Sequence, residues 1–117
     1  MRNIIAAIML ALLPLGTAGA QAHAFLDHAE PRVGSTVASA PREVSLSFTQ
    51  DLEPAFSSVE VTDAKGARVD QGKAQVSASV MRIGLKPLSP GTYKVRWRAL
   101  SVDTHTTEGS FNFRVGQ

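Results

Sequence analysis

The chain contains no cysteine among its 117 residues. This absence excludes disulfide bonds and thiolate metal sites, so the fold must depend on its apolar core and on any ligand that it binds. Aromatic residues are few: five Phe, one Trp and one Tyr. An excess of one charge is also lacking, because 12 Lys and Arg stand against 10 Asp and Glu without forming a basic run. This near balance argues against nucleic-acid binding.

Long apolar runs are absent too, except at the start of the chain. Met1-Arg2-Asn3 is a short basic start, an apolar stretch continues to Leu15, and small residues follow up to Ala20-Gln21-Ala22. This order is typical of a secretory signal peptide that ends in an A-x-A cleavage site. The run is also shorter than the ~20 residues of a membrane-spanning helix.

We therefore predict a signal peptide over 1–22 and an exported mature chain over 23–117. The mature segment is long enough for one domain with a modest core and too short for two. It contains no second apolar run of membrane-spanning length, so we expect no transmembrane segment in it. Loss of Arg2 with the leader lowers the net charge from +2 to about +1.

Several short stretches of the mature segment alternate between apolar and polar residues, which is typical of half-buried strands. The apolar members of these stretches are Val44, Leu46, Phe48, Val59, Val61, Met81, Ile83, Leu85, Tyr93, Val95, Trp97, Phe111, Phe113 and Val115. Turn sequences such as Asp63-Ala64-Lys65-Gly66 separate them, and no helical apolar stripe is present. The pattern predicts an all-β fold, an antiparallel Greek-key β-sandwich or barrel of about seven strands. Phe48, Trp97, Phe111 and Phe113 are expected in its core.

Only three histidines are present, and the first is His23, directly after the predicted cleavage site. Cleavage there would give His23 a free α-amino group. That group and the imidazole Nδ1 could bind one metal ion together in a six-membered chelate ring. The hypothesis depends on the cleavage position, since a cut after Ala20 leaves Gln21 in front and a cut after Ala24 removes His23.

A second pair of metal ligands is indicated by Asp103-x-His105. In an extended segment, residues two apart point to the same side, so the two side chains could converge on one ion. The alternative is a turn in which Asp103 binds backbone amides and His105 is solvated. With His23 added, the donor set is three nitrogens and one carboxylate oxygen, which favours Cu(II) over Zn(II). Cu(I) is disfavoured, because it prefers sulfur ligands and Met81 lies in a predicted strand.

Four segments together resemble the CopC family of periplasmic copper-resistance proteins. They are residues 23–31 (HAFLDHAEP), 44–48 (VSLSF), 91–98 (GTYKVRWR), and 101–105 (SVDTH) with Gly109. The resemblance implies a Greek-key β-sandwich in the periplasm. It also implies a histidine brace for one Cu(II) per chain: His23 by amine and imidazole, His105 by imidazole, and Asp103 as the additional ligand. It further implies a non-catalytic copper carrier or buffer in copper homeostasis and resistance, with a CopD-type inner-membrane transporter as partner. We expect the mature chain to be a monomer.

Some features leave alternatives open. Certain family members bind Cu(I) through a methionine-rich loop, and no such cluster is present here, so only the Cu(II) site is expected. An oxidative copper enzyme could use the same brace, and an adaptor domain that docks to a CopD-type transporter is a further alternative. His28 as a fifth ligand, and Glu108 as a residue that orients His105 by a hydrogen bond, also remain open.

Overall fold

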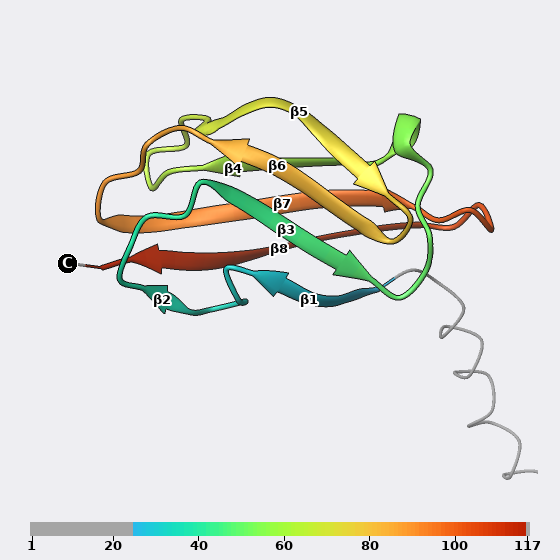
Figure 1. The fold of residues 1–117 in the computed structure, drawn as a ribbon, viewed down its shortest axis with the longest axis horizontal. Helices are drawn as coiled ribbons and strands as arrows, with labels where there is room; N and C mark the ends of the chain where they lie inside the picture. Colours follow the sequence, from blue (N-terminus) through green and yellow to red (C-terminus); the bar gives the residue numbers. More distant parts are fainter. Residues whose placement is uncertain (1–24, 117) are drawn as a thin grey trace, which may run out of the picture.

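The computed structural model describes residues 25–116, which form two four-stranded β-sheets that pack against each other (Figure 1). The predicted signal peptide over 1–22, its cleavage site and His23 lie outside the described residues. Within the described part of the chain, no helix has the length and apolar character needed to cross a membrane.

Eight strands make up the two sheets of the described chain. The first sheet has the order β1 (Leu26–Glu30), β3 (Glu43–Phe48), β6 (Val80–Leu85) and β5 (Asp70–Ser77). The second has the order β2 (Thr36–Val37), β8 (Thr106–Val115), β7 (Gly91–Leu100) and β4 (Ser58–Thr62). A short 3-10 helix, η2 (Pro54–Phe56), precedes β4. The predicted all-β sandwich is confirmed, with one addition: the two-residue β2 pairs in parallel with β8.

The core lies between the sheets and consists of the inward-facing residues of the alternating stretches. All four aromatic residues expected there are buried, with Trp97 at 9% and Phe113 at 1% exposure. The Trp97 ring meets that of Phe48 edge to face at 5.2 Å between centroids, which joins β7 of the second sheet to β3 of the first. Met81 is also fully buried, as its strand pattern predicted.

Gly109 in β8 lies directly opposite Trp97 in β7, and the indole ring occupies the space that a side chain would need. A Cβ at this position would lie 2.6 Å from Cζ2 and 2.9 Å from Cε2 of Trp97. Gly109→Ala is therefore expected to destabilise the fold by about 1–3 kcal/mol through overpacking. Thermal unfolding should show this loss. Gly84→Ala in β6 is the control, because its nearest neighbour would be Gln71 O at an ordinary 3.5 Å; equal melting temperatures would contradict the steric argument.

Asp70, the first residue of β5, links the two sheets. Its buried carboxylate accepts hydrogen bonds from Val61 N–H in β4 at 2.7 Å and from Arg68 Nε at 2.9 Å. Burial alone would raise the pKa of this carboxyl, but the hydrogen bonds from Arg68 and Val61 outweigh it and hold the pKa below its ordinary value.

Asp70→Asn is expected to lower the free energy of unfolding by about 1–3 kcal/mol at neutral pH, because the ion pair is lost. A carboxyl with a lowered pKa in the folded state stabilises above its unfolded-state pKa of about 3.9. That contribution disappears as the pH falls through the folded-state pKa. Urea unfolding at pH 7 and below pH 4 should therefore show a gap between the two proteins that narrows in acid. A gap independent of pH would contradict this role for the charge.

Candidate metal centre

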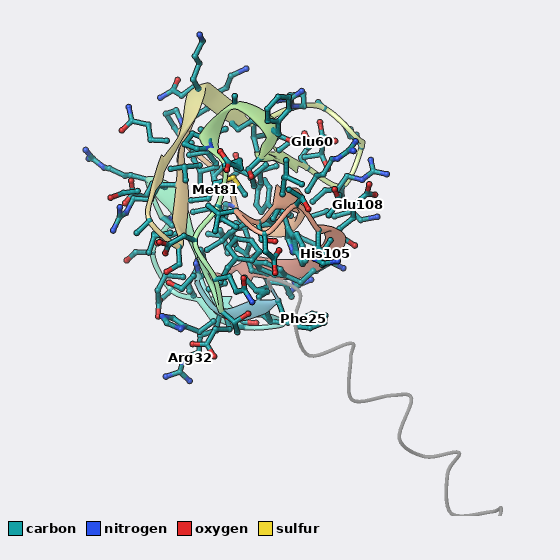
Figure 2. The ribbon with its side chains drawn as sticks, turned by 90° about the vertical axis from the view of Figure 1, so that its right-hand side faces the viewer. Phe25, Arg32, Glu60, Met81, His105 and Glu108 are labelled. Carbon is teal, nitrogen blue, oxygen red and sulfur yellow. The ribbon has the colours of Figure 1, made fainter. Side chains whose placement is uncertain are left out.

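Asp103 and His105 belong to the connection between β7 and β8, at one end of the sandwich. Backbone hydrogen bonds hold this connection against the segment after β3: Val102 N–H donates to Asp51 O at 3.0 Å, and Glu53 N–H donates to Leu100 O at 2.8 Å. The first described residue reaches the same end, because Phe25 N–H donates to Thr49 Oγ1 at 2.9 Å. Figure 2 faces this end of the molecule and shows Phe25 and His105 on it.

The structure brings the Asp103 and His105 side chains together, although not by the predicted extended segment. Thr104 has a φ of 72°, and its N–H donates to Ser101 O at 2.8 Å, so the residues form a tight turn. His105 Nδ1 then lies 3.2 Å from Asp103 Oδ1, and the two side chains are 49% and 38% exposed. The prediction of an extended backbone was wrong, because Thr104 adopts the left-handed conformation. The expected convergence of the two side chains is found.

Ser101 lies buried beneath this turn and holds it by hydrogen bonds. The sequence did not predict this role. It is fully buried, and its hydroxyl donates to Asp103 Oδ1. The same Oγ lies 3.2 Å from His105 O and accepts from His105 N–H at 3.4 Å. A signal for it was present, because Ser101 continues the inward-facing series of Tyr93 to Ala99 in β7. A lone hydroxyl at the end of an apolar series needs polar partners, and here they are the two candidate ligands.

The hydrogen bond from Ser101 also sets the charge of the candidate site. It is the main cause that holds the pKa of the Asp103 carboxyl below its ordinary value; partial burial opposes this effect, and His105 adds to it. Asp103 therefore stays ionised to a lower pH than an ordinary aspartate, and an ionised carboxylate can bind a metal ion.

His28 and Glu108, the other candidates from the sequence, contact residues outside this pair. His28 Nδ1 is 3.1 Å from Asp27 Oδ2 on the exposed side of β1, and Glu108 Oε2 is 3.9 Å from Arg98 Nε on the outer face of β8. In the part of the chain that the structure describes, no three His, Asp or Glu side chains gather as a metal site. Asp103 and His105 thus form a two-residue group among the described residues, and His23, the other expected ligand, is not among them.

The donor pair fits a first-row transition metal ion. Zinc, for example, binds imidazole nitrogen and carboxylate oxygen at about 2.0–2.2 Å, so neighbouring donors on one ion lie about 3 Å apart. The 3.2 Å between Nδ1 and Oδ1 is compatible with such sharing. One nitrogen and one anionic oxygen without sulfur suit Cu(II) better than Cu(I).

Comparison with known proteins gives consistent similarities. Residues 26–116 match the CopC domain family. Copper resistance protein C of Xanthomonas campestris pv. juglandis is 36% identical, over 97% of this chain and 96% of the relative. Copper transport protein CutJ of Bacillus subtilis is 31% identical over 82% of this chain, but over only 18% of its own length.

Two solved structures share both fold and sequence with this chain. CopC from Methylosinus trichosporium OB3b superposes with a TM-score of 0.75 at 34% identity, over 80% of this chain and 94% of that one. PcoC, a methionine-rich copper resistance protein from Escherichia coli, gives 0.70 at 34% identity, over 80% and 99%.

Proposed function

Because this chain belongs to the CopC family of copper-resistance proteins, we propose that its mature form is a periplasmic Cu(II)-binding carrier or buffer in copper homeostasis. The observation that carries the proposal is the Asp103–His105 pair, whose donor atoms lie 3.2 Å apart at an exposed end of the sandwich. An exposed pair suits a cargo ion that must enter and leave, whereas a structural ion is usually enclosed by its ligands.

One Cu(II) per mature chain would be bound by His23 through its amine and imidazole, by His105 through its imidazole and by Asp103 through its carboxylate. The end of β1 that leads back to His23 lies at the same end of the molecule as the turn, which supports this ligand set (Figure 1). Cu(I) binding has no comparable support. Met81 is the methionine of the described chain, and it is fully buried in the core.

The proposed role involves no catalysis. An oxidative copper enzyme that acts on polysaccharides would need exposed Tyr or Trp rings for sugar stacking. Tyr93 and Trp97 are both buried here, and the exposed rings of the described chain are Phe25 and Phe56. Oxygen uptake by the reduced, copper-loaded protein should therefore stay at the rate of free copper in buffer. Rapid reoxidation with substrate turnover would overturn the non-catalytic role.

The expected partner is a CopD-type copper transporter of the inner membrane, which the protein would contact as a monomer. The relative CutJ supports this partner, because the matching region is there one part of a much longer chain named as a copper transport protein.

The experiment that tests the function is a copper titration of the secreted, processed protein, with its mass measured first. We expect a mature mass that begins at His23, one Cu(II) per chain, and a tetragonal spectrum with nitrogen donors. The apo-protein should be folded, and copper should raise its melting temperature at neutral pH. A mature mass that includes Gln21, or a protein that binds no Cu(II), would overturn the proposal.

Ser101→Ala is expected to weaken Cu(II) binding about 10- to 100-fold, because residues that orient metal ligands usually contribute this much. Loss of the hydroxyl removes the hydrogen bond to the Asp103 carboxylate and the contact with His105 N–H, whereas Ser101 N–H still donates to His105 O at 2.9 Å. Competition with a chelator measures the affinity, and the Cu(II) spectrum should change as the ligands reorient. Ser110→Ala, an exposed serine of β8, is the matched control. Unchanged affinity and spectrum in Ser101→Ala would contradict a positioning role.

A further inference from the structure

Three connections between strands meet at the end of the sandwich that carries the candidate metal pair, which we call the metal end. They are residues 49–57 between β3 and β4, 78–79 between β5 and β6, and 101–105 between β7 and β8. The first two are joined by Leu52 N–H, which donates to Ala78 O at 3.0 Å, and the first and third by the hydrogen bonds given above. The three connections therefore form one surface of the folded chain.

The metal end exposes large apolar side chains. Four such side chains are exposed in the described chain, and three of them lie here: Phe25 at 41%, Phe56 at 66% and Val102 at 52%. The fourth, Val33, lies between β1 and β2. Single exposed apolar residues need no explanation, but several at one end of a small domain are typical of an interaction site.

Two of these side chains border the candidate metal pair. Val102 directly precedes Asp103 in the chain. Phe56 lines a hollow of about 380 Å³ together with Thr106, which directly follows His105. A molecule that covered Phe56 and Val102 would therefore lie against the edge of the site.

The metal end is also acidic. Its three connections contain Asp51, Glu53 and Asp103, and no Lys or Arg. The Asp51 and Glu53 carboxylates form no ion pair with the described part of the chain. Both residues lie beside the apolar ones, because Val102 N–H donates to Asp51 O at 3.0 Å and Phe56 N–H donates to Glu53 O at 3.1 Å. The surface thus combines apolar side chains with uncompensated negative charge.

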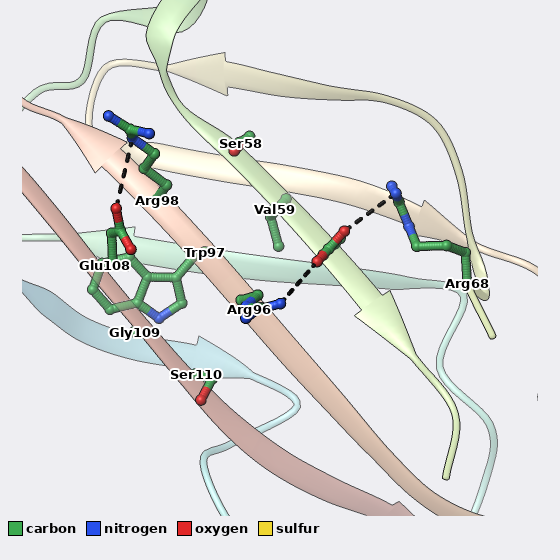
Figure 3. Close-up of a pocket in the computed structure, with 10 residues that line it drawn as sticks. Ser58, Val59, Arg68, Arg96, Trp97, Arg98, Glu108, Gly109 and Ser110 are labelled. Atoms are coloured by element: carbon green, nitrogen blue, oxygen red, sulfur yellow. Dashed lines mark hydrogen bonds and ion pairs between the residues drawn. The ribbon is translucent and has the colours of Figure 1, made fainter. Parts of the chain in front are cut away.

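The outer face of the second sheet differs, because the charges at its middle are paired. Glu60 lies 3.2 Å from Arg68 and 3.5 Å from Arg96, and Glu108 lies 3.9 Å from Arg98 (Figure 3). A charged partner would have to compete with these ion pairs. The metal end imposes no such competition on a cationic partner.

We propose that the metal end docks a segment of a copper-exchanging protein that combines apolar side chains with Lys or Arg. The apolar side chains would cover Phe56 and Val102, and the cations would pair with Asp51 and Glu53. An apolar centre with polar groups around it is the usual composition of a protein interface. The docked segment would also shield the candidate metal pair from water. Docking itself needs no metal; its link to copper exchange rests on the proposed function.

The negative charge disfavours two other occupants of this surface. A second copy that docked through its own metal end would bring Asp51 and Glu53 of both copies together, and like charges across an interface are costly. An anionic membrane would also repel these carboxylates, although the ring of Phe56 could insert into a bilayer. A cationic and apolar protein segment matches both features of the surface.

The probe for the test is a short acetylated peptide amide of Lys, Leu and Gly. One reference peptide has Gln in place of Lys, and another has Ser in place of Leu. Amide NMR titration of the metal-free mature protein in low salt measures binding. The Lys-Leu peptide should shift the amides of Asp51, Phe56 and Val102, and both reference peptides should bind at least about fivefold more weakly.

Phe56→Ser tests the apolar part of the surface and should weaken binding of the Lys-Leu peptide at least about fivefold. Val33→Ser is the matched control, because it removes a similarly exposed apolar side chain outside the metal end, and it should change binding less than about twofold. Equal losses in the two variants would overturn the proposal, since any exposed apolar residue would then explain binding.

The double variant Asp51→Asn, Glu53→Gln tests the charge and should also lose at least about fivefold in low salt. Its control is the double variant Glu30→Gln, Glu43→Gln, which has the same net charge and should lose less than about twofold. Equal losses would refute the docking surface, because net charge alone would then account for binding.

Two further results would overturn the proposal. Binding to phosphatidylglycerol vesicles without binding to the peptide would favour a lipid surface, and self-association that Phe56→Ser abolishes, again without peptide binding, would favour a second copy. Copper titration separates docking from the proposed function, and Phe56→Ser should keep its Cu(II) affinity. A protein that binds the peptide at this surface but no Cu(II) would refute the proposed function alone. A protein that binds Cu(II) but not the peptide would refute the docking surface alone.

Discussion

Retention of a single residue before His23 is expected to weaken Cu(II) binding about 100-fold or more, which corresponds to about 2.7 kcal/mol. The added residue converts the α-amine of His23 into an amide, which becomes a donor only after it loses its proton. The chelate ring between the backbone nitrogen and the imidazole Nδ1 is lost with it. Asp103, His105 and the His23 imidazole would then hold the ion without the chelate, since no third His, Asp or Glu joins the pair in the described chain.

The comparison needs the mature protein and a form that keeps Ala22, both titrated against a competing chelator. A form extended at the C-terminus by one residue controls for the change in length. Unfolding curves of the two apo-proteins should coincide, because the core is built from strands that begin at Leu26. Equal copper affinity with and without Ala22 would refute the role of the N-terminal amine.

His105→Ala is expected to remove most of the copper affinity, again about 100-fold or more, while Asp103→Ala should lose about tenfold. The imidazole is a principal ligand in the proposed set, whereas the carboxylate adds one oxygen and a negative charge. His28→Ala is the matched control, because its imidazole lies against Asp27 on β1 and not at the turn. Chelator competition and Cu(II) spectra measure all three variants.

The pH dependence gives an independent check on the same ligands. The lowered pKa of Asp103 keeps this carboxylate ionised in mild acid, so its protonation should not be the step that releases copper. Ordinary imidazoles titrate near pH ~6.5 and α-amines near ~7.7–8.0, so protons compete for the nitrogen donors first. Copper binding should therefore weaken below neutral pH while the apo-protein remains folded. Binding undiminished at pH 4.5, or a loss of affinity in His28→Ala as large as in His105→Ala, would contradict the assignment.

The sandwich could be predicted because most of its strands bury one face and leave the other in water. β5 and β2 could not be predicted, because neither shows this alternation of buried and exposed residues. In β5, Asp70 is the one buried residue, and the pairing with β6 shifts register between Gln71 and Gln75. β2 contains two residues and owes its existence to a parallel pairing with β8 from the far end of the chain.

The candidate site was predictable in its residues but not in its backbone. Asp103 and His105 could be chosen by chemistry, because carboxylate and imidazole are metal donors. A threonine at positive φ has no recognisable signal, so the turn at Thr104 was out of reach. The role of Ser101 could not be predicted, because it depends on the burial of this residue and on its hydrogen bonds across the turn. The ion pairs on the outer face of the second sheet depend on strand register, which places Arg96 beside Glu60 and Arg98 beside Glu108.

The division of the proposed ligands between the two sheets has a dynamic consequence. β1, which follows His23, is an edge strand of the first sheet, whereas Asp103 and His105 connect β7 and β8 of the second. An edge strand at a chain terminus is among the first elements to open locally. A copper ion bound by both parts would join them and suppress this opening. Amide hydrogen exchange in β1 should then slow on metal binding, while exchange in the central strands β3 and β7 changes little. The exchange rate of β1 would thus report whether copper is bound.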